Sequence, residues 1–306
     1  MSNDDDEIEA PYYVDGCVIA KEHVYIASKF ESMDEEDYDF TRMVTYREGE
    51  WFAHDLEWDV RSVCCWREKG KWTTCALSTR GDVYLRTENS FSIERIPEAG
   101  ADGLGALTQV RSIGGSLYAC GFNGQVYRRE SKGWVHFDAG LLEREPGDVE
   151  LYLAGIDGTS DSDIYVVGTD GHIFHWDGKA WRGVKSPTKA HLERVRCVDR
   201  GEVYICGYEG AFLRGNARDG FHLLEVEEEE EFWGLEIFRD KVYLASLSGL
   251  FTLEGDIAVS LDTSLEPAID GYRLDSADGV LWSFGSEDLA YFDGRTWTRV
   301  VDPDSE

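Results

Sequence analysis

A pattern of apolar runs separated by short polar turns repeats along the chain. Each copy has an apolar run, a turn that usually closes with glycine, and a second apolar run, as in YACGFNGQVY (118–127) and YVVGTDGHIF (165–174). Six copies align without gaps and begin at residues 75, 118, 165, 204, 243 and 282, and a degenerate seventh begins at Tyr25. Two apolar runs around a tight turn predict a β-hairpin in each copy.

Further apolar segments flank each hairpin. LTQVRSI (107–113) precedes one hairpin, and GWVHFD (133–138) follows it. Four short strands in each repeat of about 40 to 50 residues are typical of a β-propeller blade. Strands such as IYVV (164–167) are apolar at consecutive positions, which suits a sheet covered on both faces by its neighbours. The pattern therefore predicts an all-β fold, a single seven-bladed β-propeller of four-stranded antiparallel blades.

The predicted blades account for most of the chain. They span residues 12–56, 60–97, 107–138, 151–186, 192–226, 232–262 and 268–301. An acidic N-terminal tail, 1–11, precedes them, and a C-terminal tail, 302–306, follows. Because the first strand opens the first blade and the last completes the seventh, we expect packing between blades to close the ring, unless residues 1–11 add a strand.

Aromatic residues recur at fixed places in the repeat. Tyr127 is followed seven residues later by Trp134, and Phe174 by Trp181. This spacing resembles the kelch-type repeat, although G-x-x-G stands where kelch blades have adjacent glycines and the dipeptide pattern of WD repeats is missing. The copy at 163–188 is similar to the blades of bacterial propeller proteins. The resemblance implies the propeller fold and no particular activity.

The N-terminus and the cysteines bear on the compartment. The first residues, MSNDDDEIEAPYY, lack the basic and apolar regions of a signal peptide, and no apolar run approaches the ~18 residues of a membrane helix. We therefore expect a cytoplasmic protein. The seven cysteines are odd in number and have no CxxC spacing, which favours reduced core cysteines over a disulfide or a zinc site.

Charge narrows the classes of partner. The chain has 61 acidic and 30 basic residues, a net charge of −31, which argues against nucleic acid or an anionic membrane as partner because the field repels phosphate. Three short segments hold 17 of the acidic residues, with five in the tail, six at 31–39 and six at 225–231. In a blade, the turn between the second and third strands emerges on the same face as the connection to the next blade. We therefore predict that all three segments lie on one face.

That face is the predicted partner-binding surface. Its candidate residues are Asp34, Glu35, Glu36, Asp37, Tyr38, Asp39, Asp170, Tyr208, Glu209, Glu227, Glu228, Glu229, Glu230, Glu231, Phe232, Trp233 and Glu287. The carboxylates would steer a basic protein, and the aromatic side chains would supply desolvated anchors. The alternative is that these loops only keep the protein soluble.

Catalytic and metal-binding patterns are weak. The sequence has no G-x-S-x-G elbow, phosphate-binding loop or dinucleotide fingerprint. His172 and His175 fall on opposite faces of a strand, so they cannot bind one metal ion together. The Asp-rich segment 157–163 is more typical of a solvated turn than of a calcium site. The innermost strands place a mixed set in the channel: Asp15, Arg61, Gln109, Tyr152, Arg194, Glu236 and Tyr272. We predict no catalytic residue, no metal and no cofactor.

An acidic, stand-alone propeller without a leader resembles the immunity proteins of bacterial toxin–immunity pairs. The resemblance implies a cytoplasmic antitoxin that covers the active site of a cognate basic toxin with its acidic face and is a monomer when free. Two alternatives stay open: a scaffold or adaptor in a protein complex, and a propeller hydrolase or lyase with a metal in the channel.

Overall fold

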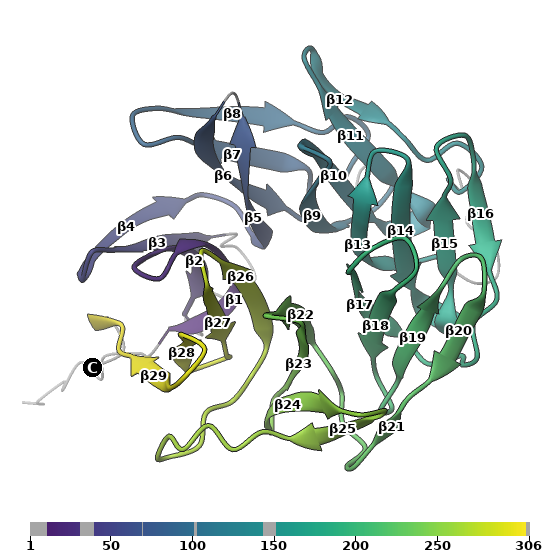
Figure 1. The fold of residues 1–306 in the computed structure, drawn as a ribbon. Coiled ribbons are helices and arrows are strands. Elements are labelled where there is room, and N and C mark those ends of the chain that lie inside the picture. The colour runs from purple at the N-terminus through teal and green to yellow at the C-terminus, as the bar shows by residue number, and fades with distance from the viewer. Residues whose placement is uncertain (1–10, 31–39, 69, 101–102, 143–150, 304–306) are drawn as a thin grey trace, which may run out of the picture.

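Seven antiparallel β-sheets follow one another around a central channel (Figure 1). The computed structural model describes residues 11–30, 40–68, 70–100, 103–142 and 151–303. Each sheet is one blade. The first strand of each blade lies innermost, where it packs against the first strands of the neighbouring blades, as β5 does against β1 and β9. The predicted seven-bladed β-propeller is confirmed.

The first four blades each contain four strands. Blade 1 contains β1 (Tyr12–Ala20), β2 (His23–Lys29), β3 (Thr41–Arg47) and β4 (Glu50–Leu56). Blade 2 contains β5 (Val60–Glu68), β6 (Lys71–Ser78), β7 (Asp82–Arg86) and β8 (Phe91–Arg95). Blade 3 contains β9 (Leu107–Ile113), β10 (Ser116–Gly121), β11 (Val126–Glu130) and β12 (Gly133–His136), with the short 3₁₀ turn η2 (Phe122–Gly124). Blade 4 contains β13 (Leu153–Ser160), β14 (Asp163–Gly168), β15 (Ile173–Trp176) and β16 (Trp181–Val184), with η3 (Thr169–Gly171).

The last three blades include one departure from the predicted pattern. Blade 5 contains β17 (Leu192–Cys197), β18 (Val203–Gly207), β19 (Phe212–Asn216) and β20 (Gly220–Leu223). Blade 6 contains β22 (Gly234–Phe238), β23 (Lys241–Ser246), β24 (Gly249–Glu254) and β25 (Ile257–Ser260), and β21 (Glu225–Val226) adds a fifth strand parallel to β25. Blade 7 contains β26 (Arg273–Ala277), β27 (Val280–Phe284), β28 (Leu289–Phe292) and β29 (Trp297–Val300). None of the elements described is a helix long and apolar enough to cross a membrane.

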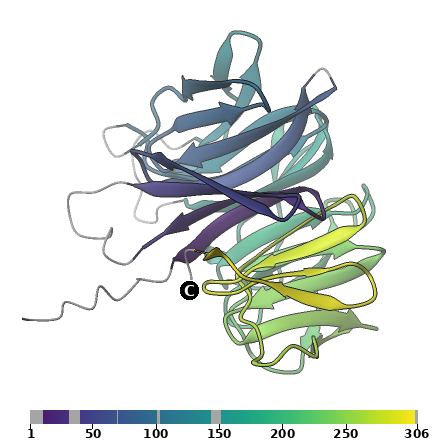
Figure 2. The same ribbon diagram turned by 90° about the vertical axis from the view of Figure 1, so that its left-hand side faces the viewer.

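Packing between the first and last blades closes the ring, as expected. The two blades form separate sheets, and in Figure 2 the purple strands of blade 1 lie against the yellow strands of blade 7. Val24 and Ile26 of blade 1 share a buried cluster with Trp282 and Phe284 of blade 7. One backbone hydrogen bond also crosses the seam, from the Tyr13 N–H to the carbonyl of Ser286 at 2.9 Å.

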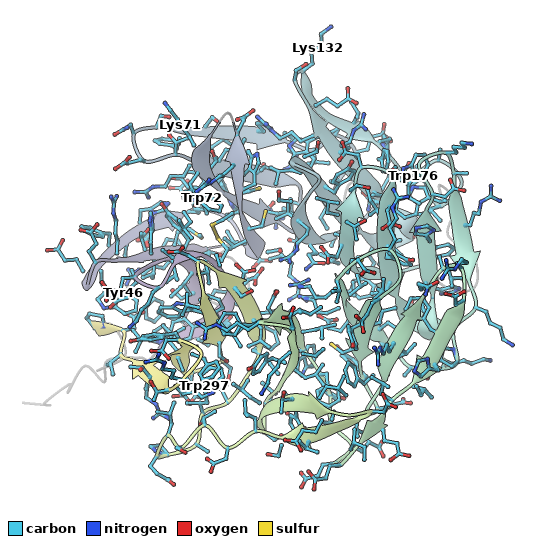
Figure 3. The ribbon with its side chains drawn as sticks, viewed as in Figure 1. Tyr46, Lys71, Trp72, Lys132, Trp176 and Trp297 are labelled. Carbon is cyan, nitrogen blue, oxygen red and sulfur yellow. A yellow bond between two sulfur atoms is a disulfide. The ribbon has the colours of Figure 1, made fainter. Side chains whose placement is uncertain are left out.

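The recurring aromatic residues fill the spaces between blades. The side chains at the equivalent position of the repeat are all buried: Tyr118, Tyr165, Tyr204, Tyr243 and Trp282. Figure 3 shows the interior of the ring filled with side chains, while Lys132 projects outward from the tip of the β11–β12 hairpin. Burying apolar area on both faces of every sheet explains why the strands are apolar at consecutive positions.

The cysteines are not all reduced. Cys17 in β1 and Cys65 in β5 form a disulfide between blades 1 and 2, with a Cα–Cα distance of 5.9 Å. The free thiols are those of Cys64, Cys75, Cys120, Cys197 and Cys206. The sequence-based expectation was therefore wrong for one pair, because the ring brings together two inner strands whose cysteines are 48 residues apart.

Candidate functional site

Two sets of loops share one face of the ring, which we call the connection face. They are the turns between the second and third strands of each blade and the connections between successive blades. In blade 5, the Gly210 N–H of the turn donates to the carbonyl of Glu230 in the connection at 2.8 Å. The Phe232 N–H donates to the carbonyl of Gly207 at 3.0 Å. The acidic run 225–231 therefore lies beside the turns, as the repeat predicted.

Most predicted partner-binding residues that the structure describes reach solvent on this face. The exposed ones are Asp170, Glu209, Glu227, Glu228, Glu229, Glu231 and Glu287, and the half-buried ones are Tyr208, Glu230 and Trp233. Asp34, Glu35, Glu36, Asp37, Tyr38 and Asp39 lie outside the described residues, as do residues 1–10 of the N-terminal tail.

Phe232 was wrongly predicted as a surface residue. Its side chain is fully buried between blades 5 and 6, where its ring meets that of Phe251 edge-on at 5.4 Å. The extended backbone turns successive side chains to opposite sides, so Phe232 faces the core while Trp233 faces the channel mouth. Phe232 therefore anchors the connection and leaves the contact surface to its neighbours.

An acidic pocket of about 360 Å³ opens on the connection face between blades 5 and 6. It is lined by Glu209, Glu229, Glu230, Glu231, Trp233 and Leu247. Glu230 is held in place, because its carboxylate accepts a hydrogen bond from the Ser246 hydroxyl at 3.0 Å. The side chain of Leu247 is 55% exposed, so the pocket combines an apolar wall with four carboxylates.

The acidic run begins at the outer edge of blade 6. Glu225 and Val226 form β21, which pairs with the outermost strand β25. The Glu225 N–H donates to the carbonyl of Asp256 at 3.1 Å, and the Glu227 N–H to that of Ala258 at 2.9 Å. The run is thus fixed at both ends and crosses the face from the rim to the channel mouth. The sequence-based bounds placed residues 225–226 at the end of blade 5, whereas the structure pairs them with the outer strand of blade 6.

Six aromatic rings form a continuous arc around the channel mouth. In order, they are Phe122, Tyr152, His191, Tyr208, Trp233 and Tyr272, and adjacent ring centroids lie 4.6, 5.3, 4.6, 4.9 and 5.5 Å apart. Only Tyr208 and Trp233 of these six were predicted to belong to the binding surface. The sequence does contain a signal for the arc, because four of the six rings belong to the residue immediately before the inner strand of a blade. This aromatic arc passes beside the acidic pocket, since Trp233 belongs to both.

The buried carboxylate of Glu193 lies beneath the aromatic arc and contacts two arginine side chains. One oxygen of Glu193 accepts hydrogen bonds from Arg194 at 2.9 Å and Arg273 at 3.2 Å, and the other lies 3.1 Å from Nε2 of His191. Burial alone would raise the pKa of Glu193, but Arg194, His191 and Arg273 outweigh it and lower that pKa to about 2. Glu193 is therefore ionised at neutral pH.

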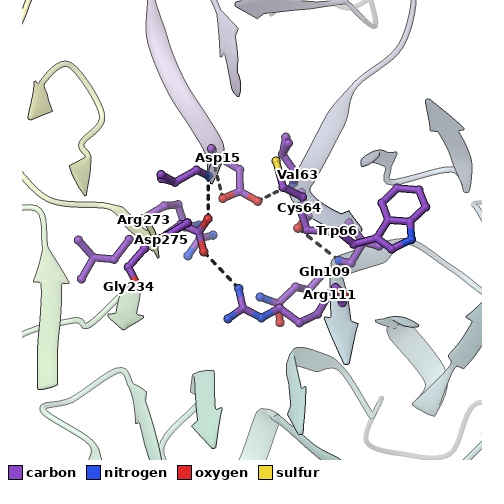
Figure 4. Close-up of a pocket in the computed structure, with 18 of the residues that line it drawn as sticks. Asp15, Val63, Cys64, Trp66, Gln109, Arg111, Gly234, Arg273 and Asp275 are labelled. Carbon is purple, nitrogen blue, oxygen red and sulfur yellow. Dashed lines mark hydrogen bonds and ion pairs between the residues drawn. The ribbon is translucent and has the colours of Figure 1, made fainter. Parts of the chain in front are cut away.

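A second charged network lies farther along the channel. Arg111 is 3.3 Å from Asp157, 3.5 Å from Asp275 and 3.9 Å from Glu236, and Figure 4 shows Arg111 and Asp275 facing each other. Arg196 donates to Glu236 at 3.0 Å. Burial raises the pKa of Asp275 to about 6, with Arg111 opposing and Glu236 adding to the effect. The carboxylates of this network are engaged by arginines, and no three His, Cys, Asp or Glu side chains of the described residues are grouped to hold a metal ion.

Six of the seven residues predicted to line the channel border its cavities. Asp15, Gln109 and Arg194 line one cavity along it, and Arg61, Tyr152 and Tyr272 line a second cavity at the mouth. Glu236 belongs to the network around Arg111. The channel is therefore a polar passage with a different charge balance at each end.

The fold places the chain among the β-propeller proteins. The WD40 β-propeller domain of Doa1 superimposes with a TM-score of 0.67 at 11% identity, covering 96% of this chain and 94% of that one. YCF48, in a structure bound to D1 peptide, also gives a TM-score of 0.67, at 14% identity over 96% of this chain and 93% of its own. At such identities these likenesses concern the fold alone.

Sequence similarity is more specific. No family model matches the chain. Immune protein Tsi7 of Pseudomonas aeruginosa is 30% identical over 296 residues, which cover 94% of this chain and 96% of Tsi7. The chain belongs to the family of immune protein Tsi7.

Proposed function

We propose that this protein is a non-catalytic immunity protein that neutralises a cognate basic toxin through its connection face. The observation that carries the proposal is the kinship with immune protein Tsi7, which extends over nearly the whole of both chains. The net charge of −31 and the acidic pocket beside the aromatic arc support a basic partner.

The two parts of the surface have different roles in this proposal. The exposed carboxylates raise the rate of encounter with a basic protein, and this effect weakens as salt screens the charges. The aromatic arc, from Phe122 to Tyr272, provides area that is desolvated on binding and slows dissociation. Bound there, the propeller blocks the toxin's active site or substrate groove.

Neutralising the acidic run is expected to weaken toxin binding. A variant with Glu227→Gln, Glu228→Gln, Glu229→Gln, Glu230→Gln and Glu231→Gln loses five charges from the connection face. We expect its dissociation constant for the cognate toxin to rise at least about tenfold at low ionic strength. The difference should narrow at about 0.5 M salt, where the Debye length is only a few ångströms. Surface-based binding kinetics at both salt concentrations would measure the effect.

A matched control removes five exposed charges from the opposite face. It carries Glu50→Gln, Glu88→Gln, Glu254→Gln, Asp240→Asn and Asp278→Asn. Both variants change the net charge equally, so only a local contact distinguishes them. Equal losses in the two variants would contradict the acidic face as the interface. Binding of the toxin at a one-to-one ratio without loss of its activity would contradict neutralisation itself.

A further inference from the structure

Three arginines from three different blades converge beneath the aromatic arc. Arg61 is in β5, Arg194 in β17 and Arg273 in β26, and each is near the end of its strand at the connection face. Glu193 contacts Arg194 and Arg273 through the same oxygen, at 2.9 and 3.2 Å. A single carboxylate is therefore hydrogen-bonded to two guanidinium groups, whereas Arg61 interacts with Glu193 only over a longer distance.

Arg61 faces an open cavity. Together with Tyr152 and Tyr272 it lines the space of about 490 Å³ at the channel mouth. Among the described residues it forms no ion pair within 4.0 Å, but its burial is outweighed by Tyr272, Glu193 and a hydrogen bond with Tyr152, which raise its pKa. The carboxylate that lines the same cavity, Asp59, is paired with Lys29. Asp15, farther along the channel, accepts the N–H groups of Gly16 at 2.9 Å and Val63 at 2.7 Å.

The local electrostatics agree with an excess of positive charge. Burial alone would raise the pKa of Tyr272, but Arg273 and Arg61 outweigh it and lower that pKa below its ordinary value. Burial and the neighbouring Arg273 lower the pKa of Arg194. In addition, Nε of Arg273, a residue only 3% exposed, has no hydrogen-bond partner. Three arginines, Arg61, Arg194 and Arg273, thus meet two carboxylates, Glu193 and Asp15, around the channel mouth, an excess of one positive charge among these groups.

We infer that the channel mouth is a carboxylate-binding site, in which Arg61 and the hydroxyls of Tyr152 and Tyr272 receive an acidic side chain or the C-terminal carboxylate of the bound partner. The planar guanidinium presents paired donors that match the two oxygens of a carboxylate. The surrounding aromatic arc excludes water, which strengthens such a pair. The cavity has room for a complete side chain.

The source of the carboxylate follows from the charge of the whole molecule. A protein with a net charge of −31 repels a free anion. A carboxylate that belongs to a basic toxin reaches the site because the acidic connection face attracts the toxin as a whole. This part of the inference rests on the proposed function. The site thereby fixes the orientation of the bound toxin, because only one orientation brings the acidic group to the channel mouth. Charge attraction alone does not select an orientation.

The site is testable without a toxin, using glutarate as a probe of the free full-length protein. Isothermal titration calorimetry should show saturable binding of one glutarate, weakened about tenfold or more by Arg61→Gln. Arg61→Lys keeps the charge and should bind with intermediate affinity. Arg218→Gln, which removes an exposed arginine paired with Asp219, should bind as the wild type does. Equal affinity of the wild type and Arg61→Gln for glutarate, including no binding by either, would overturn the site.

The toxin complex then identifies the occupant. If the toxin supplies the carboxylate, the complex no longer binds glutarate, and Arg61→Gln weakens the complex by about thirtyfold or more. If the complex still binds glutarate and tolerates Arg61→Gln, the toxin does not occupy the site, and that part of the inference is wrong. The acidic-run variants test the proposed function separately, so each failure can be recognised.

Discussion

Replacing Glu193 by glutamine is expected to lower the free energy of unfolding by about 3 to 5 kcal/mol. Glutamine keeps the shape of the side chain but removes the negative charge that Arg194 and Arg273 contact. Their buried guanidinium groups then repel each other and Arg61 without this compensation. Urea denaturation followed by circular dichroism at pH 7 measures the loss.

The pH dependence of stability provides a second measurement of the same effect. The folded-state pKa of Glu193 is about 2, below its ordinary value of 4.5. The stability that it contributes is therefore fully present above about pH 4.5 and is lost as the pH falls toward 2. The wild type should lose this contribution on acidification, whereas Glu193→Gln should lack that part of the pH dependence.

A control for Glu193 is available on the surface. Glu287 lies exposed in a turn of blade 7, and Glu287→Gln should change the free energy of unfolding by no more than about 0.5 kcal/mol. If Glu193→Gln were as stable as Glu287→Gln at pH 7, the balance of charges described for the channel mouth would be incorrect.

The blades could be predicted from the sequence because their signals are local. An apolar run, a turn and a second apolar run determine a hairpin, and the repeat then assigns the remaining strands by analogy between copies. The same logic placed Glu209 and the run 227–231 on one face, since strand order dictates which loops meet. Blade architecture and the location of the acidic run therefore followed from positions within one repeat.

Features that depend on contacts between blades were not predicted. The aromatic arc joins residues of five blades, so no single repeat contains it. Cys17 and Cys65 meet only because adjacent inner strands converge on the axis. The same holds for Arg61, whose neighbours Tyr152, Glu193 and Tyr272 belong to other blades. The assignment of Phe232 failed at a finer scale, since one residue of register decides between core and surface.

The first glycine of the G-x-x-G pattern explains how the repeat supports the candidate site. A methyl group on Gly207 would lie 1.9 Å from the carbonyl oxygen of His191, and one on Gly168 would lie 1.8 Å from that of Tyr152. These close approaches allow the next N–H to bond the same carbonyl, from Tyr208 at 2.9 Å and from Thr169 at 3.0 Å. Glycine is thus required where a turn is pressed against an inner strand that carries the aromatic arc.

Replacing Gly207 by alanine is accordingly expected to disturb both stability and binding. The added methyl group meets backbone atoms of His191 and Leu192, which cannot rotate away, so β18 must move from β17. We expect the free energy of unfolding to fall by about 3 kcal/mol. His191 and Tyr208 are neighbours in the aromatic arc, with ring centroids 4.6 Å apart, so the affinity for the toxin should also fall.

Gly183 provides the matched control for this substitution. It lies in the outer strand β16, and a methyl group there would be no closer than 3.9 Å to Phe174, which is an ordinary contact. Gly183→Ala should therefore retain wild-type stability and toxin binding. Urea denaturation and binding kinetics on the two variants separate the cases. If Gly207→Ala matched Gly183→Ala in both measurements, the close approach of the turn to the inner strand would not be what holds the aromatic arc in place.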